Sequence, residues 1–163
     1  MKKRHSLDQL KSIVARERKA GKRIVLANGC FDLIHVGHIR YLRESKERGD
    51  ILVVALNSDS SVRKLKGPGR PILGEEERVA IISSFDFVDY ITVFEEPDVA
   101  EILLALKPDI HAKGSDYTEE TVPERKTVLS YGGTTAITGG PKVKSTSEII
   151  RQILDKLRSQ ASR

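Results

Sequence analysis

Short apolar runs alternate along the chain with segments in which apolar residues recur at helical spacing. The runs are β-branched or aliphatic and mostly lack polar alternation, as strands buried on both faces require. They lie at residues 23–28, 51–56, 90–94, 109–114 and 134–139. Helices are predicted at residues 7–20 and at about 37–49, 74–84, 97–106, 121–131 and 146–160. This alternation predicts an α/β fold, a doubly wound parallel sheet of about five strands with helices on both faces.

The stretch that joins the first predicted strand to the next helix concentrates polar residues. The strand ends near Asn28, and the helix is predicted to begin near Val36 or Gly37. In open parallel sheets, ligands bind beyond the carboxyl ends of the strands, near the point where the strand order reverses. His35 and His38 would lie there, one helical turn apart, where free backbone N–H groups attract phosphate. We therefore expect both imidazoles to donate hydrogen bonds to phosphoryl oxygens, while Gly37 lets a polyphosphate approach the backbone.

Paired histidines also suit two other roles. A zinc site uses histidine ligands, but it needs a third or fourth ligand at a recognisable spacing, and none is evident in the sequence. A histidine at a helix start can also serve only to hydrogen-bond the backbone, and "HVGH" taken alone does not separate this role from phosphate binding. Asp32 is out of place in a simple anion site. It makes sense if it faces a Mg²⁺ ion carried by a nucleotide or orients a ligand group.

Length and charge narrow the class of protein. The 163 residues suit a single domain, taken as residues 1–163, with residues 1–23 as a basic helical extension. The net charge of +5 is local, because those first 23 residues hold nine Lys or Arg against two acids. No aromatic residues interleave these charges, so we expect a solvated helix face and no nucleic-acid partner.

Cysteine content and hydropathy bear on location. Cys30 is the only cysteine, so the chain forms no internal disulfide, as expected in a reducing compartment. No apolar run approaches the roughly 20 residues that a membrane-spanning helix needs. We therefore expect a cytoplasmic protein without membrane association.

Several segments together resemble one enzyme superfamily. "HVGH" is similar to the HxGH motif of the nucleotidylyltransferases, and "NGCFDLIHVGHIRYL" is similar to their cytidylyltransferase-like branch. Further matches follow in order at residues 56–72, 75–91, 107–117 and 144–150, so the resemblance covers about residues 24–153. The combination of "NSD", "LKGPGRP" and "KGSDY" looks like the adenylyltransferase domains of ADP-heptose synthases. The resemblance implies the Rossmann-like nucleotidylyltransferase fold.

The resemblance also implies a reaction. AMP would pass from ATP to D-glycero-β-D-manno-heptose 1-phosphate, giving ADP-heptose and pyrophosphate for lipopolysaccharide core biosynthesis. Mg²⁺ would be required with the ATP, with no metal site built from protein side chains alone. Relatives are often dimers, so a homodimer is one arrangement to test. The alternative is a cytidylyltransferase acting on glycerol 3-phosphate or a related phosphorylated small molecule. A nucleotide-binding regulator without turnover is a further hypothesis from a different class.

The resemblance assigns roles to individual residues. The catalytic residues would be His35, His38 and Lys66. Nucleotide binding is implied for Asn28, Gly29, Cys30, Phe31, Asp32, Gly37, His38, Lys113, Gly114, Ser145, Thr146 and Ser147. Binding of phosphate or of the acceptor is implied for Asp32, Asn57, Arg63, Lys66, Arg70, Arg78 and Asp116. The Gly/Pro-rich loop at residues 66–71 would close over substrate and open for release.

Some of these residues also suit purely structural roles, which the sequence does not separate from the functional ones. Arg78 could be an exposed helix charge paired with a neighbouring glutamate, and Asp116 could cap a turn. Ser145 is expected to cap the last helix, with Glu148 near a capping-box position, whether or not it also meets a phosphate. The preceding segment "PKVKSTS" departs from the glycine and Ser-Thr-Thr that the family commonly has, which weakens any statement about the sugar.

Overall fold

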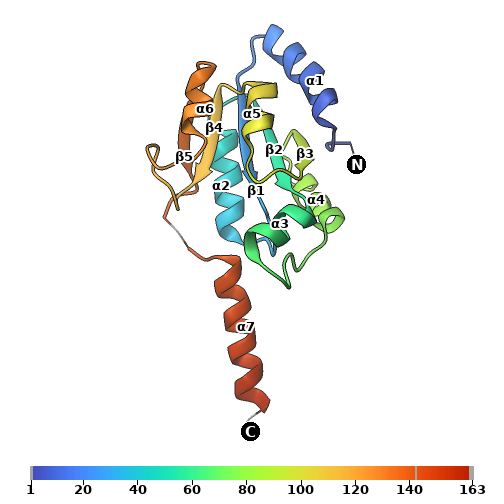
Figure 1. The fold of residues 1–163 in the computed structure, drawn as a ribbon, viewed down its shortest axis with the longest axis vertical. Helices are drawn as coiled ribbons and strands as arrows, with labels where there is room; N and C mark the ends of the chain where they lie inside the picture. The colour runs from blue at the N-terminus through green and yellow to red at the C-terminus, as the bar shows by residue number, and fades with distance from the viewer. Residues whose placement is uncertain (1, 142, 162–163) are drawn as a thin grey trace.

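The computed structural model describes residues 2–141 and 143–161, and the strands within them form one parallel sheet (Figure 1). The strands are β1 Ile24–Gly29, β2 Ile51–Asn57, β3 Tyr90–Phe94, β4 Ile110–Gly114 and β5 Thr134–Thr138. Their order across the sheet is β3-β2-β1-β4-β5, and every neighbouring pair is parallel. The predicted α/β architecture is therefore confirmed. Strand order reverses between β1 and β4, which is where a ligand cleft is expected in such sheets.

Helices cover both faces of this sheet. They are α1 Leu7–Lys19, α2 Val36–Lys46, α3 Asp59–Lys66, α4 Glu75–Ser83, α5 Ala100–Leu106, α6 Arg125–Ser130 and α7 Thr146–Ala161. Successive strand residues point to opposite faces, so each strand contributes to two cores. On one face, strand side chains pack with α2 and α4, and on the other they pack with α1, α5 and α6. Helix α1 thus packs against the sheet through Leu10 and Val14, which are buried in that core.

The helices differ from the predicted ones at α2, α3, α5 and α6. Helix α2 ends at Lys46, before the predicted end near residue 49. Helix α3 was not predicted, because its eight residues carry only two apolar side chains and show no clear period. It forms because the Ser58 hydroxyl caps it, accepting from the N–H of Ser61 at 3.2 Å. Helices α5 and α6 are shorter than predicted, since residues 97–99 and 121–124 form bends and turns before each helix starts.

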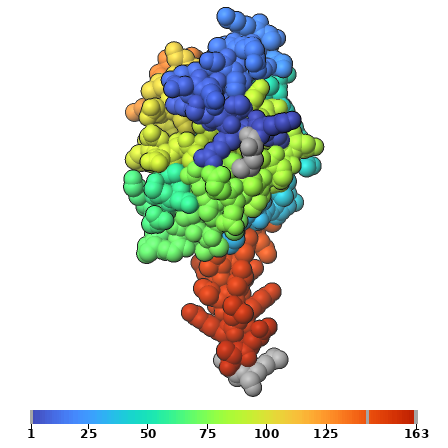
Figure 2. Space-filling view, turned by 90° about the vertical axis from the view of Figure 1, so that its right-hand side faces the viewer, coloured from blue at the N-terminus to red at the C-terminus, as the bar shows by residue number. Residues whose placement is uncertain are grey.

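Helix α7 stands away from the rest of the molecule. Figures 1 and 2 show it projecting from one end of the body, and none of its side chains is buried. Ile153, Leu154 and Leu157 lie half exposed along it. Within residues 2–141 and 143–161, no helix is both long enough and apolar enough to cross a membrane.

The guanidinium of Arg78 ties together segments that are far apart in the sequence. This side chain on α4 is fully buried. It donates to the carbonyl oxygens of Leu73, Cys30 and Asn57 at 3.1, 2.6 and 2.7 Å. It also pairs with the carboxylate of Asp59 at 2.7 Å. Arg78 therefore joins the ends of β1 and β2 to the start of α3 and the loop before α4.

Replacing Arg78 should destabilise the fold. Arg78→Met would leave three carbonyl oxygens without a donor, so we expect a loss of about 3 kcal/mol in the free energy of unfolding. For a chain of this size that loss lowers Tm by roughly 6–12 °C. Thermal unfolding followed by circular dichroism measures it. The exposed Arg48, changed to Met as a control, should shift stability by no more than about 0.5 kcal/mol. Equal Tm values for the two variants would contradict the assigned role of Arg78.

Candidate active site

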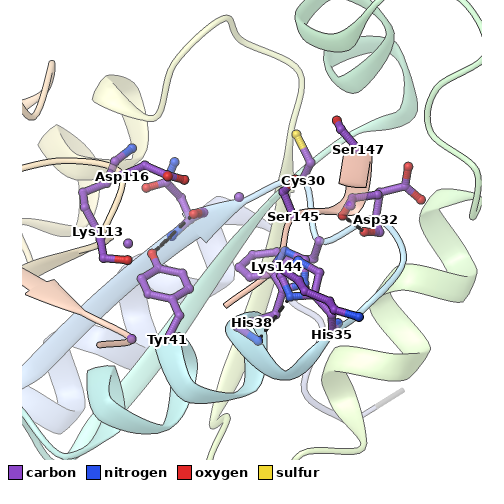
Figure 3. Close-up of a pocket in the computed structure, with 18 of the residues that line it drawn as sticks. Cys30, Asp32, His35, His38, Tyr41, Lys113, Asp116, Lys144, Ser145 and Ser147 are labelled. Atoms are coloured by element: carbon purple, nitrogen blue, oxygen red, sulfur yellow. Dashed lines mark hydrogen bonds between the residues drawn. The ribbon is translucent and has the colours of Figure 1, made fainter. Parts of the chain in front are cut away.

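A pocket of about 460 Å³ lies at the carboxyl ends of β1 and β4 (Figure 3). It is lined by the loop from β1 to α2, the end of α3, the loop after β4 and the start of α7. The predicted residues that line it are Asn28, Gly29, Cys30, Phe31, Asp32, His35, Gly37, His38, Asn57, Lys66, Arg70, Lys113, Gly114, Asp116, Ser145, Thr146 and Ser147. Arg63 and Arg78 are not among the lining residues: Arg63 is exposed on α3, and Arg78 lies buried behind the pocket.

Backbone N–H groups at the start of α2 determine which ring nitrogen of His35 and His38 carries the proton. His35 is the N-cap of α2, and its Nδ1 accepts a hydrogen bond from the N–H of Gly37 at 3.1 Å. The Nδ1 of His38 accepts from the N–H of His35 at 3.4 Å. A neutral imidazole whose Nδ1 is an acceptor carries its proton on Nε2. The two rings, with centroids 3.9 Å apart, therefore each hold one Nε2–H donor.

Burial keeps both imidazoles neutral. It lowers the pKa of His35 below its ordinary value. It lowers the pKa of His38 to about 4, and the neighbouring His35 ring adds to this effect. At neutral pH the rings are thus uncharged donors, and a nearby anion would favour their protonation.

Gly37 makes room for this arrangement. A Cβ at this position would lie 2.9 Å from Cε1 and 3.0 Å from Nδ1 of His35. The ring of His35 could not then fold back over the helix N-terminus. The glycine between the histidines therefore serves the position of His35, a role that the sequence analysis did not assign to it.

Asp32 anchors the pocket loops through its carboxylate. The side chain is 1% exposed and accepts from Arg70 Nε at 2.7 Å and from the N–H groups of Ile72 and Leu73 at 2.9 and 3.0 Å. Burial alone would raise the pKa of Asp32, but these three donors outweigh it and lower the pKa. The carbonyl oxygen of Asp32 accepts from the Thr146 hydroxyl at 2.6 Å. Asp32 thus joins three segments of the site, an anchoring role that its sequence position did not suggest.

The backbone on either side of Asp32 is strained. Phe31 and Leu33 both adopt positive φ, at 51° and 44°, in a region that costs a non-glycine residue about 1–2 kcal/mol. Strain of this kind persists only where surrounding contacts over-determine the conformation. The hydrogen bonds to Asp32, which lies between the two residues, supply those contacts.

The cations of the pocket differ in how they are held. Arg70 is half-buried and paired with Asp32. Lys66 is the last residue of α3 and is exposed at the pocket. Lys113, at the end of β4, is 8% exposed, and its Nζ lies 3.5 Å from the buried carboxylate of Glu124. It also lies 4.9 Å from the ring centroid of Tyr117. Figure 3 shows Lys113 and Asp116 on the opposite side of the pocket from the histidines.

The start of α7 has the predicted cap. The Ser145 hydroxyl accepts from the N–H of Glu148 at 3.2 Å, and the Glu148 carboxylate accepts from the N–H of Ser145 at 2.6 Å. The capping box expected from the sequence is therefore confirmed. It holds the N-terminus of α7 at the pocket wall, beside the loop that carries Asp32.

Three contributors to the site were missed from the sequence. The Tyr41 hydroxyl, on the inner face of α2, lies 2.8 Å from the carbonyl oxygen of Ala112 and 3.2 Å from the N–H of Asn28. Glu124 balances Lys113, and His111 contacts Asn28 from β4 at 2.9 Å. Tyr41 could have been found from its spacing, since it lies one turn beyond His38 on α2. No sequence pattern indicates Glu124 or His111, because their partners are distant in the sequence.

The side chains do not form a resident metal site in the part of the chain that the structure describes. No group of three or more His, Cys, Asp or Glu residues converges among them. The pocket carboxylate of Asp32 is already engaged by three donors.

Comparison with known proteins identifies the family. The model of the cytidylyltransferase-like family matches residues 26–152. Bifunctional protein HldE of Pelobacter propionicus is 48% identical over 149 residues, which is 91% of this chain and 30% of that protein. The HldE of Geobacter sulfurreducens is 46% identical over the same share of each chain. The chain thus spans about 30% of the length of these relatives.

A solved structure shows the same likeness. The crystal structure of the lipopolysaccharide core biosynthesis protein from Thermoplasma volcanium GSS1 is 37% identical, with a TM-score of 0.61. The similarity covers 72% of this chain and 94% of that one. Because the family model matches residues 26–152, most of its length, this chain belongs to the cytidylyltransferase-like family.

Proposed function

We propose that the pocket transfers AMP from ATP to the phosphate of D-glycero-β-D-manno-heptose 1-phosphate, releasing pyrophosphate. The observation that carries this proposal is the pair of Nε2–H donors of His35 and His38 at the N-terminus of α2. Two donors on a positively polarised helix end suit the phosphoryl oxygens of a nucleotide. The exposed Lys66 adds a cation at the same pocket.

The proposed reaction needs no covalent enzyme intermediate. An oxygen of the acceptor phosphate attacks the α-phosphorus of ATP, and the bond from that phosphorus to the bridging oxygen of the β-phosphate breaks. The electron pair leaves with pyrophosphate. Because both reactants are anions, the protein must hold them in line and stabilise the charge that develops at the α-phosphoryl and leaving groups. The histidine donors and Lys66 would supply that stabilisation.

The acceptor is inferred from sequence similarity and from the names of relatives. The relative from Thermoplasma volcanium is named a lipopolysaccharide core biosynthesis protein. The segments "LKGPGRP" and "KGSDY" are similar to those of heptose 1-phosphate adenylyltransferases, which favours ATP over CTP. Cytidylyl transfer to glycerol 3-phosphate is the alternative, and no observation favours it. The reaction would take place in the cytoplasm, where ATP is available.

Mg²⁺ is proposed to arrive with the nucleotide. The side chains do not provide a cage for it in the described ranges, so its ligands would come from the phosphates and water. Bound there, it would neutralise part of the triphosphate charge.

The substrates can be tested directly. Pyrophosphate release should be measured with ATP or CTP against heptose 1-phosphate, glycerol 3-phosphate and other sugar phosphates. We expect release with ATP and heptose 1-phosphate, and its loss when EDTA removes Mg²⁺. No release from heptose 1-phosphate, together with release from another acceptor, would overturn the proposed substrate but not the proposed chemistry.

Removing the imidazoles should abolish most of the activity. His35→Ala and His38→Ala should each lower kcat by on the order of 10²–10³-fold, because each removes a donor to the reacting phosphates. The double variant should lose at least as much. His5, which lies against Tyr90 away from the pocket, is the matched control, and His5→Ala should leave the rate unchanged. Full activity in the double variant would refute the proposed role of the histidines.

ATP binding should take up protons through the histidines. The pKa of His38 is about 4, and a bound triphosphate should raise it. At a pH between the pKa of His38 in the free protein and its pKa in the ATP complex, ATP binding adds a proton to His38. The affinity for ATP therefore rises as the pH falls through the pKa of the complex. Titration calorimetry at pH 6 in two buffers of different ionisation enthalpy measures the uptake. His38→Asn should reduce it, and ATP's own titration cancels in that comparison. Equal uptake by both proteins would contradict the assignment.

A further inference from the structure

The side chain of Asn28 is held from behind the pocket by a buried histidine. Asn28 is near the carboxyl end of β1 and lines the pocket. Its Oδ1 lies 2.9 Å from Nε2 of His111, which is on β4 and has no exposed surface. In the parallel register His111 is opposite Leu26, so it shares a sheet face with Asn28, two residues further along β1. His111 is not part of the pocket lining.

The contact assigns the proton of His111. An amide oxygen only accepts hydrogen bonds, so Nε2 of His111 must donate to Asn28. The Nδ1 of His111 then remains as a buried acceptor without a partner among the described residues. If the amide of Asn28 were turned round, Nε2 would accept, and a buried Nδ1–H would have no acceptor. An orphaned buried N–H is the rarer arrangement in proteins, so the first orientation is favoured.

This orientation gives the amino group of Asn28 a direction. The amide is planar, with Nδ2 and Oδ1 at opposite corners, so Nδ2 points away from His111. Among the described residues no hydrogen bond from Nδ2 is found. We propose that His111 is a positioning residue that holds the Asn28 amide so that Nδ2 donates to an oxygen of the bound nucleotide. This inference rests on the proposed function only in requiring that a nucleotide occupy the pocket.

The environment of His111 keeps this donor constant. Burial lowers the pKa of His111 to about 3, and the positive charge of Lys113 on the same strand lowers it further. His111 therefore stays neutral over the pH range in which the protein would work. Its Nε2–H bond to Asn28 does not change with pH there, unlike the protonation expected for His38.

A double-mutant cycle tests the proposal, with the equilibrium Kd for ATP as its readout. Asn28→Ala removes the donor and should weaken binding about tenfold. Asn28→Asp keeps the acceptor for His111 but has no amino group, so it should weaken binding at least as much. His111→Leu frees the amide and should weaken binding roughly three- to tenfold. The decisive result is that His111→Leu has no further effect in the Asn28→Ala background.

Two variants separate positioning from general damage to the sheet. His111→Gln restores a side-chain N–H that can reach Asn28, so it should recover most of the ATP affinity lost in His111→Leu. Thr135 is opposite His111 in the β4–β5 register, and its buried hydroxyl has no partner among the described residues. Thr135→Val therefore removes a neighbouring polar group without touching Asn28, and it should leave Kd unchanged.

The outcomes are distinct. If His111→Leu weakens ATP binding equally in both backgrounds, the role of His111 is merely structural and the proposal is overturned. Normal ATP binding by Asn28→Ala would also overturn it. A non-additive cycle in a protein that transfers AMP to no acceptor would support the positioning role while refuting the proposed function. If the unchanged chain binds no ATP, both are overturned.

Discussion

The buried carboxylate of Asp32 is the constraint on which the pocket depends. It receives one side-chain and two backbone donors from residues 70–73, and its own carbonyl receives the Thr146 hydroxyl. A buried charge without partners would be costly, so the loops that provide them must stay in place. These same contacts hold Phe31 and Leu33 in unfavourable backbone conformations. The loop that leads to the histidines is therefore shaped by residues 70–73, about forty positions away in the sequence.

The electrostatics of the site follow from how each charge is compensated. Arg70 is neutralised by Asp32, and Lys113 by Glu124. The histidines are neutral donors because burial disfavours their charged forms. Lys66, by contrast, is exposed and without an ion pair to any described residue. A polyanion that enters the pocket would thus contact oriented N–H groups. Its negative charge would then favour protonation of the two imidazoles.

Local sequence patterns predicted the sheet, the start of α2 and the cap of α7. The strands were predictable because runs such as residues 51–56 are apolar on both faces. The cap was predictable because Ser145 and Glu148 have the spacing of a capping box. Long-range features were not predictable in this way. Arg78 has the sequence context of an exposed helix charge, yet it is fully buried and donates to the carbonyl oxygens of Cys30 and Asn57, which are distant in the sequence. Helix α3 is too short to show a period. The resemblance, not periodicity, brought the distant pocket residues together.

Helix α7 starts at the pocket wall and projects away from the body (Figure 1). It begins at Thr146, bonded to the loop of Asp32, and its side chains are not buried against the body. At 1.5 Å per residue, its length amounts to about 24 Å. A rotation of about 10° at its base would move its far end by roughly 4 Å on that geometry. Small changes around the cap are therefore magnified at Ala161, where a spectroscopic label would detect them without touching the pocket.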